Sequence, residues 1–292
     1  MTGRLVGLAA LALLVGACAS TSASPSTSAV PAGPDPTRRG PQGHVAQFIV
    51  QCDLSHVAYD DPIVHPGMAG MSHLHQFFGN RDVDSDPDYE RVQGAETSCR
   101  QSLDTASYWA PALLDSMGAQ VEPTGFTAYY RPGRGVDPVD VEPYPAGLML
   151  IGGDAMATEP QSTDIVAWSC GTGATRDVRP PACPASMPLR MLVTFPDCWD
   201  GEKLTGLGDD APARYSDDSG CPDEFPVAVP QLTIAIDYPA VDPTGLTLAS
   251  GDVITGHADF WNVWNQEKLE QEVALCLNRD LVCGVSDVGS SR

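Results

Sequence analysis

Basic side chains are scarce in this sequence of 292 residues, which contains 16 lysines and arginines against 38 aspartates and glutamates. Only two of the basic residues are lysines, Lys203 and Lys268. The formal net charge of −22 would repel the phosphates of nucleic acids and anionic lipid headgroups. We therefore exclude nucleic acid as a partner. The acidic residues are scattered rather than gathered in a tail, and their simplest role is to keep the protein soluble.

No apolar run is long enough to span a bilayer as a stable helix. Residues 5–15 are apolar and follow Arg4, which is the layout of an export signal over residues 1–17. Small residues precede Cys18, as in a bacterial lipobox, where cleavage before the cysteine leaves it as a lipid-modified N-terminus. We expect an extracytoplasmic protein anchored through Cys18 to the outer face of the cytoplasmic membrane, with no other membrane contact. The alternative is cleavage after Ala19 and a secreted soluble protein.

The sequence also lacks any C-x-x-C pair, which argues against a thiolate zinc site. Apart from Cys18, eight cysteines remain, and an even number in an exported chain indicates a disulfide framework. Sequence alone leaves many pairings open. We expect neighbours to pair, because the last four cysteines bracket an acidic loop and the end of the expected C-terminal helix. The expected pairs are Cys52–Cys99, Cys170–Cys183, Cys198–Cys221 and Cys276–Cys283.

Two common catalytic motifs are absent as well. There is no G-x-S-x-G motif of a serine hydrolase. Residues 152–154 (GGD) precede no convincing helix, so a phosphate-binding loop is not expected. A glycosidase would need two carboxylates about 5–10 Å apart across a cleft, but this acidic chain offers too many candidate pairs for the sequence to select one.

Residues 43–285 contain no linker, repeat or low-complexity tract, and we expect them to form a single domain. Residues 18–42 are rich in Ser, Thr, Ala, Pro and Gly and indicate a disordered tether, and residues 286–292 a flexible tail. Short apolar or β-branched runs between proline and glycine breaks predict strands. These runs are residues 45–51, 126–131, 147–152, 164–169, 189–195, 227–236 and 252–257.

One good helix candidate covers residues 261–277, where apolar residues recur four apart and Asn262 or Asn265 could cap the start. A weaker candidate covers residues 108–116. The balance of elements predicts a mainly β fold: a β-sandwich or jelly-roll-like domain with long loops, one C-terminal helix and disulfides.

Histidines are few, and four of the six lie within residues 52–80. His73 and His75 stand two apart, which in an extended segment directs both imidazoles to one face. His257 and Asp259 repeat that spacing far downstream. We expect these four side chains to meet in one small shell of mixed ligands that suits a divalent transition metal such as zinc, copper or manganese, or non-haem iron. The alternative is a knot of hydrogen bonds without a metal.

His56 is a candidate catalytic residue at the edge of this shell, with Asp60 or Asp61 as the carboxylate that would orient it. Asp60 and Asp61 are adjacent and point to opposite faces of an extended segment, so both cannot serve one site. His65 is expected to be exposed or structural.

Aromatic side chains could bind the flat faces of sugar rings. Trp199, in a polar loop, is the best exposed candidate. Tyr129 and Arg131, in the run that ends YYR, are the other ligand-binding candidates.

A series of motifs extends over nearly all of residues 43–283: QCDLSHVAYDDPIV, PGMAGMSHLHQFFGN, SYWAPAL, YYR, PAGLMLIGGDA, FPDCWDG, GHADFWNVW and CLN. In this order they resemble a group of secreted fungal and bacterial proteins known as domain of unknown function 1996. The activity of that family is not established. Its fungal members often stand beside carbohydrate-binding modules, which implies a polysaccharide or cell-wall glycan as the partner.

The chain departs from this resemblance in one segment. After FPDCWDG, relatives carry a run like L-D-S-x-D-H-x-S-H-x-A-Y, whereas residues 204–215 read LTGLGDDAPARY. Asp209 and Pro212 stand where histidines are usual, and Phe225 replaces another. The resemblance therefore implies either that part of the family's chemistry is lost or that Asp209 takes the place of an imidazole as a catalytic group.

Two functions remain open on the sequence. The first is an exported, lipid-anchored enzyme with a metal-assisted His/Asp site that acts on cell-wall or environmental polysaccharide. The second is a non-catalytic cell-surface lipoprotein that binds a glycan, or has a structural role, through the same face. The sequence makes no prediction of the oligomeric state.

Overall fold

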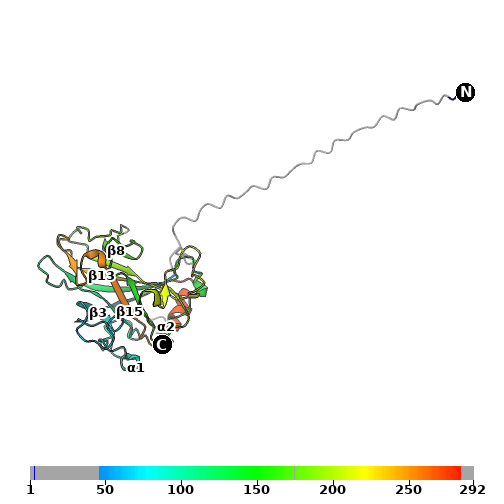
Figure 1. Ribbon diagram of the computed structural model, residues 1–292, viewed down its shortest axis with the longest axis horizontal. Helices are drawn as coiled ribbons and strands as arrows, with labels where there is room; N and C mark the ends of the chain where they lie inside the picture. The colour runs from blue at the N-terminus through cyan, green and yellow to red at the C-terminus, as the bar shows by residue number, and fades with distance from the viewer. Residues whose placement is uncertain (1–2, 4–45, 174, 284–292) are drawn as a thin grey trace. The chain divides into compact units, whose positions relative to one another are not determined.

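The computed structural model describes residue 3, residues 46–173 and residues 175–283 (Figure 1). The expected export signal, the tether, Cys18 and the C-terminal tail lie outside the described residues, apart from Gly3. Within the described part of the chain, no helix combines the length and the apolar character that crossing a bilayer requires.

Two five-stranded antiparallel sheets make up most of the fold. In spatial order the first contains β1 (Phe48–Cys52), β6 (Gly125–Arg131), β13 (Gln231–Tyr238), β9 (Leu189–Thr194) and β8 (Val166–Cys170). The second contains β2 (Leu54–Ala58), β3 (His75–Gly79), β4 (Ser107–Pro111), β15 (His257–Trp261) and β7 (Met149–Gly153). Figure 1 shows β8 and β13 in one layer and β3 and β15 in the other.

Smaller elements complete the fold. Short strands form one three-stranded sheet, β11 (Ala213–Arg214), β10 (Cys198–Trp199) and β12 (Val227–Ala228), and one pair, β14 (Thr247–Leu248) with β5 (Leu113–Leu114). The helices are α1 (Tyr89–Val92) and α2 (Gln266–Glu272), which continues into a π-helical turn, Val273–Leu277. Single 3₁₀ turns cover Pro138–Asp140, Gly208–Asp210 and Val253–Thr255.

The expected mainly β architecture is confirmed, with three local corrections. The predicted helix over residues 108–116 is wrong, because this segment forms β4 and β5. The predicted strand over residues 252–257 is a 3₁₀ turn, and the strand begins only at His257. The C-terminal helix begins at Gln266 rather than residue 261, with the Asn265 side chain accepting a hydrogen bond from the Lys268 backbone N–H.

The second sheet has apolar side chains on both faces. Its inner face shares one large core with the first sheet, to which Phe78, Tyr108 and Phe260 contribute. Its outer face carries a second, smaller cluster that includes Phe77 and Trp109. Because both faces are covered, β4 and β15 are buried at every position and show no alternation of polar and apolar residues. This explains why the sequence pattern did not predict them as strands.

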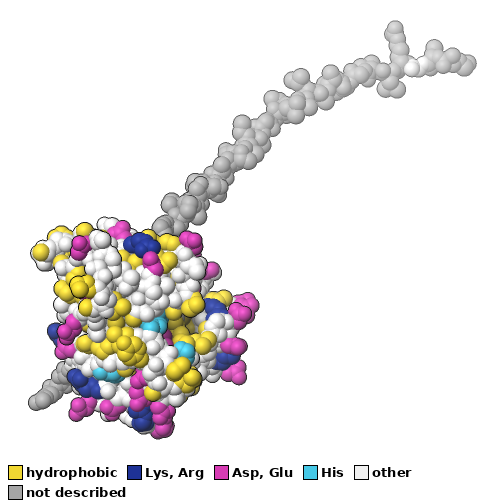
Figure 2. Space-filling view, turned by 60° about the vertical axis from the view of Figure 1, so that its left-hand side comes forward, with side chains coloured by type: hydrophobic (Ala, Val, Ile, Leu, Met, Phe, Trp, Pro, Cys, Tyr) yellow, Lys and Arg dark blue, Asp and Glu magenta, His cyan; other side chains and the backbone are white. Residues whose placement is uncertain are grey.

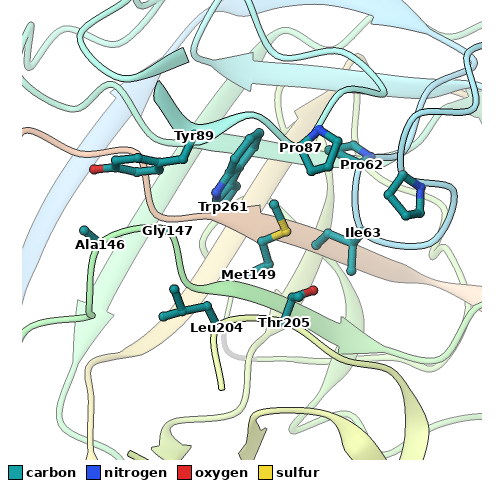
Figure 3. A pocket seen from close by; sticks show the side chains of 11 residues that line it. Pro62, Ile63, Pro87, Tyr89, Ala146, Gly147, Met149, Leu204, Thr205 and Trp261 are labelled. Atoms are coloured by element: carbon teal, nitrogen blue, oxygen red, sulfur yellow. The ribbon is translucent and has the colours of Figure 1, made fainter. Parts of the chain in front are cut away.

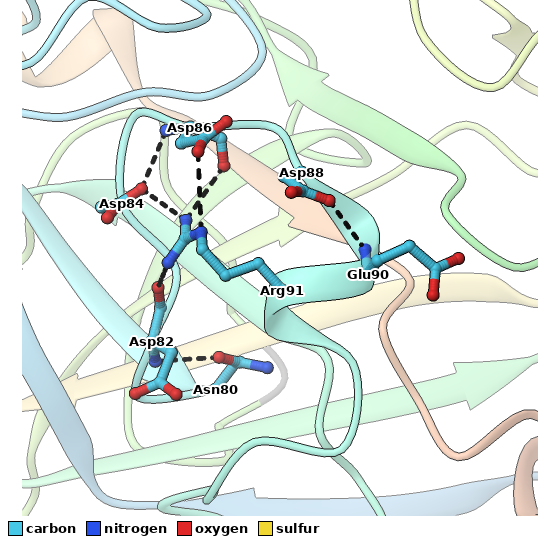
Figure 4. A network of polar contacts seen from close by, with 7 residues as sticks. All are labelled: Asn80, Asp82, Asp84, Asp86, Asp88, Glu90 and Arg91. Atoms are coloured by element: carbon cyan, nitrogen blue, oxygen red, sulfur yellow. Dashed lines mark hydrogen bonds and ion pairs between the residues drawn. The ribbon is translucent and has the colours of Figure 1, made fainter.

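The segment after β3 helps to cover the outer face. Its carboxylates are balanced by a cation from the chain itself: the Arg91 guanidinium donates to the backbone carbonyls of Asp82 and Asp86 and to Asp84 Oδ1 (Figure 4). This arrangement holds α1 in place, with Val92 buried in the smaller cluster.

The four expected disulfides are all present: Cys52–Cys99, Cys170–Cys183, Cys198–Cys221 and Cys276–Cys283. Each closes a loop between neighbouring cysteines, so the predicted framework is confirmed. The last of them closes the C-terminal turn, next to the place where Gln47 bridges Val282.

Candidate metal centre

The candidate site lies on the outer face of the second sheet. Strand β4 separates β3 from β15, and the register places Phe77, Trp109 and Asp259 side by side. Since side chains alternate along a strand, the outer face carries His75 next to Phe77 on β3, and His257 next to Asp259 on β15. The two-residue spacing in the sequence thus places both pairs on one face.

His73, from the loop between β2 and β3, completes a cluster of three imidazoles. Its ring centroid lies 4.2 Å from that of His75 and 5.0 Å from that of His257. The centroids of His75 and His257 are 6.1 Å apart. One ring nitrogen from each of the three residues lies within 4.8 Å of the others, which is a separation that allows a common ligand.

Backbone carbonyls orient two of these rings. The Nδ1 atom of His75 donates to the carbonyl of Asp60 at 3.0 Å, and that of His257 donates to the carbonyl of Thr255 at 2.9 Å. In the neutral rings this leaves the lone pair on Nε2. Histidines that bind metals commonly have this arrangement, in which a hydrogen bond to the far nitrogen fixes the tautomer.

Two buried carboxylates adjoin His75. An oxygen of Asp61, an oxygen of Asp259 and a ring nitrogen of His75 lie within 4.8 Å of one another. Asp61 Oδ1 accepts hydrogen bonds from the backbone N–H groups of Ile63 and Val64, both at 2.9 Å. His75 therefore belongs to two overlapping donor groups, one of imidazoles and one with two carboxylates.

Burial sets the protonation states in the metal-free protein. It lowers the pKa of His75 well below 6.5, and the neighbouring histidines lower it further. Burial also lowers the pKa of His73, to about 4. Burial raises the pKa of Asp259 well above 3.8, and the nearby charge of Asp61 adds to this rise. At neutral pH the imidazoles are thus neutral, which is the state in which they bind a metal.

Several atoms of the cluster that could bind a metal ion have no hydrogen-bond partner among the described residues. Among the described residues, no partner is found for Nε2 of His73, Nε2 of His75 or either carboxylate oxygen of Asp259, although all four atoms are buried. Buried polar atoms are nearly always paired, and those without a partner require an explanation. The hydrogen bonds that His75 and His257 do make go to backbone carbonyls, and none joins His73, His75, His257 and Asp259 to one another.

His56 and Asp60, which were expected next to these ligands, do not direct their side chains into the cluster. His56 lies on the same face but stacks on Phe77, with ring centroids 4.5 Å apart, and its Nδ1 bonds Ser55 Oγ. Phe77 separates it from the cluster. Asp60 contributes its backbone carbonyl, while its side chain accepts a hydrogen bond from the Gly70 backbone. The structure shows no hydrogen bond between His56 and Asp60.

The candidates from other segments do not join the cluster. Asp209 is exposed in a 3₁₀ turn, where its backbone carbonyl accepts from Arg214. Trp199 is half-buried, and its Nε1 donates to the Lys203 carbonyl. Tyr129 and Arg131 lie on the first sheet.

Pro212 and Phe225 stand at two positions where the family resemblance leads one to expect histidines. Pro212 lines a cavity of about 270 Å³ together with Gly153, the β7 residue opposite His257. Phe225 packs under the guanidinium of Arg214.

The sequence patterns did not identify Asp61 as a carboxylate beside His75. A local signal exists, because an aspartate whose side chain accepts from backbone N–H groups two and three residues later initiates a turn. That turn directs Asp61 inward and leaves Asp60 outside. His65 is half-buried, and its charge contributes to lowering the pKa of His73.

An apolar cavity of about 410 Å³ lies on the same face of the second sheet, next to the candidate metal ligands (Figure 3). Trp261 and Met149 lie on the two paired strands beneath it, and Trp261 follows Asp259 by two residues. Pro62 and Ile63, directly after Asp61, form one wall, and Tyr89 from α1 another. The space-filling view shows histidine side chains at the surface between hydrophobic ones (Figure 2).

The fold and the site define a disulfide-bonded β-sandwich protein with a histidine-rich candidate metal centre. Residues 61–264 match the family described as Domain of unknown function (DUF1996), and the chain belongs to this family. The matched segment includes all five candidate metal ligands, from Asp61 to Asp259. No curated protein and no solved structure matches the chain.

Proposed function

We propose that the protein is an exported, metal-dependent enzyme that acts on a cell-wall or environmental polysaccharide. The observation that carries the proposal is the convergence of three neutral imidazoles with two buried carboxylates, in which four of the buried polar atoms have no hydrogen-bond partner among the described residues. Polar atoms gathered and desolvated without partners cost free energy in the absence of a ligand.

The donor set fits a divalent transition metal. Imidazole nitrogens with one or two carboxylate oxygens suit zinc, copper, manganese or iron better than calcium or magnesium, which prefer oxygen ligands alone. A metal bound there with an open coordination position would supply Lewis acidity. His73, His75 and His257 would hold the ion, and Asp61 or Asp259 would balance its charge.

The polysaccharide part of the proposal rests on the family resemblance and on the adjacent cavity. Sugar rings present apolar faces to aromatic side chains, and the partly exposed Tyr89 borders this cavity. Asp209, which is exposed and apart from the cluster, has no role in this proposal.

Metal analysis of the mature protein, purified without a histidine tag, tests the proposal. We expect about one equivalent of a transition metal, and after chelation we expect zinc, copper or manganese to rebind. His73→Ala should abolish stoichiometric binding, because it removes one of three imidazoles. Since His73 is only half-buried, the variant should still fold with its four disulfides.

His56→Ala is the matched control, because His56 lies on the same face but outside the donor set. It should bind metal like the wild type. The metal-loaded wild type, but not His73→Ala, should then release soluble sugar from a cell-wall polysaccharide preparation. A wild-type protein that neither retains nor rebinds any of these metals would contradict the proposal.

A second candidate function is supported by the segment 204–215. If the missing histidines at Asp209 and Pro212 carry out the family's reaction, this member would bind a glycan without turning it over. Binding of polysaccharide by the metal-loaded protein, with no sugar released, would favour this non-catalytic role.

The location of the protein is proposed from its N-terminal sequence. We expect Cys18 to be lipid-modified and the protein to sediment with membranes, while Cys18→Ala should appear in the soluble fraction. One lipid chain binds a membrane only marginally, so stable retention requires at least two. A mature N-terminus at Ser20, found by mass spectrometry, would show that the protein is secreted instead.

A further inference from the structure

A second candidate site lies on the outer face of the first sheet, on the opposite side of the sandwich from the histidines. Three arginines, Arg131, Arg176 and Arg190, border a cavity of about 190 Å³ there. Tyr129 and Thr233 also line it. Positive charge concentrated in one small cavity is unexpected in a chain with a net charge of −22.

Arg131 is the central residue of this cavity. Its Nε donates to the Gln47 side chain at 2.9 Å, and its guanidinium lies over the Tyr129 ring, 4.6 Å from the centroid. Its two terminal nitrogens make no hydrogen bond to any described residue. An arginine cannot lose its proton to avoid burial, so a guanidinium withdrawn from water needs an anion nearby.

The carboxylates in the neighbourhood do not supply that anion. Asp237 is engaged by Arg190, whose Nε and Nη2 donate to its two oxygens at 2.6 and 2.7 Å. Arg176 forms no ion pair with a described residue, and its one hydrogen bond goes to the Thr163 carbonyl. Burial lowers the pKa of Arg131, and the charge of Arg176 adds to this lowering. Two arginines thus share a cavity without a carboxylate between them.

We propose that Arg131 and Arg176 bind a single oxyanion, the carboxylate or sulfate group of a small acidic sugar. Guanidinium groups present paired N–H donors that match the oxygens of such anions, and hydroxyl groups at the cavity wall can complete the contacts. The cavity admits one small charged group, while the acidic surface around it repels long polyanions. This binding site is independent of the proposed metal centre and of any reaction there.

Calorimetric titration of the mature protein with three related sugars tests this site: galacturonate, galactose 6-sulfate and neutral galactose. We expect at least one acidic sugar to bind and galactose not to bind. The acidic sugar that binds identifies the source of the oxyanion. Arg176→Gln should weaken binding by about tenfold or more, as should Arg131→Lys, which keeps the charge but loses the paired donors.

Arg179→Gln is the matched control. It removes the same charge three residues from Arg176, but Arg179 is exposed and paired with Asp252, away from the cavity. The Arg179→Gln protein should bind the acidic sugar with the same affinity as the wild type. Because Arg176 is exposed, its substitution should leave the thermal unfolding unchanged, so that any loss of binding is not a loss of fold. Equal weakening in Arg179→Gln, or no binding of either acidic sugar, would overturn the proposal.

Discussion

Replacing Asp104 by asparagine is expected to reduce the pH dependence of stability on the alkaline side of neutrality. Asp104 is fully buried, where its carboxyl accepts from the Tyr108 hydroxyl at 2.7 Å and from the Ala106 backbone N–H at 3.0 Å. Tyr108 in turn bonds the Tyr130 hydroxyl, to which Trp264 Nε1 donates. Burial raises the pKa of Asp104 to about 8 from an ordinary value of 3.8.

The sign of the effect follows from the two protonation states. Between these two pKa values the folded protein holds a proton on Asp104 that the unfolded chain has released. The stabilisation is therefore complete below the unfolded pKa and is lost as the pH rises through the folded pKa. The free energy of unfolding should fall by about 1.4 kcal/mol per pH unit on account of this residue.

Other buried groups determine where the effect can be measured. Burial lowers the pKa values of His73, His75 and His257, so protonation of the unfolded chain weakens the fold below about pH 6.5 and opposes the effect of Asp104 there. Above this pH the histidines are neutral in both states. Asp259 still acts in the same direction as Asp104, because burial raises its pKa too.

Guanidinium denaturation at about pH 7 and pH 8, with the disulfides intact, measures the difference. The amide of Asp104→Asn resembles the protonated acid in size and carries no charge. Between pH 7 and pH 8 the variant should lose about 1 kcal/mol less stability than the wild type, because Asp104 is half ionised near pH 8. Asp209→Asn, at an exposed carboxylate, should keep the wild-type slope. Equal slopes for all three proteins would mean that Asp104 is ionised in the folded state.

Substitution of Gly79 by alanine is expected to prevent folding or to cost more than about 3 kcal/mol. Gly79 ends β3 with a φ of +83°, which an L-residue with a side chain rarely adopts. A Cβ there would lie 2.1 Å from the Ala106 carbonyl oxygen. That oxygen accepts the Asn80 backbone N–H at 2.8 Å, so it cannot move aside without breaking the pairing of β3 and β4. A clash with backbone in addition to φ strain exceeds the cost of either alone.

Gly118→Ala separates the two causes. Gly118 has a similar φ of +78°, but a Cβ there would have no atom within 4 Å. It should lower the free energy of unfolding by only about 1 kcal/mol, the cost of the backbone conformation. Yield of soluble protein and thermal denaturation would be compared for both variants. A Gly79→Ala protein as stable as Gly118→Ala would show that β3 and β4 can shift apart.

Local patterns in the sequence predicted the convergence of the candidate ligands better than they predicted the strands that carry them. The two-residue spacing of His73 with His75, and of His257 with Asp259, needed only the alternation of a strand to imply a common face. That Asp61 joins them depends on a turn that reverses the chain over the sheet. The spacing within β15 contains no information about this long-range contact, so the sequence could not rank Asp61 above Asp60.

The disulfides were predictable because all four close loops between cysteines adjacent in sequence. The start of the C-terminal helix could not be predicted from the spacing. Trp261 and Trp264 continue the apolar spacing of α2, although Trp261 belongs to β15. Its burial on the outer face depends on the cover provided by α1 and the segment before it. Periodicity in one segment does not show what covers the opposite face.

The described fold begins and ends at one place. Gln47 pairs with Val282, its N–H donates to the Leu281 carbonyl, and its own carbonyl accepts from Cys283. Whatever is joined to either end therefore meets the body of the molecule at the same corner, beside the edge strand β1. Such a module could be inserted into a surface loop of another protein, or circularly permuted through a short connection across this corner, without stretching either sheet.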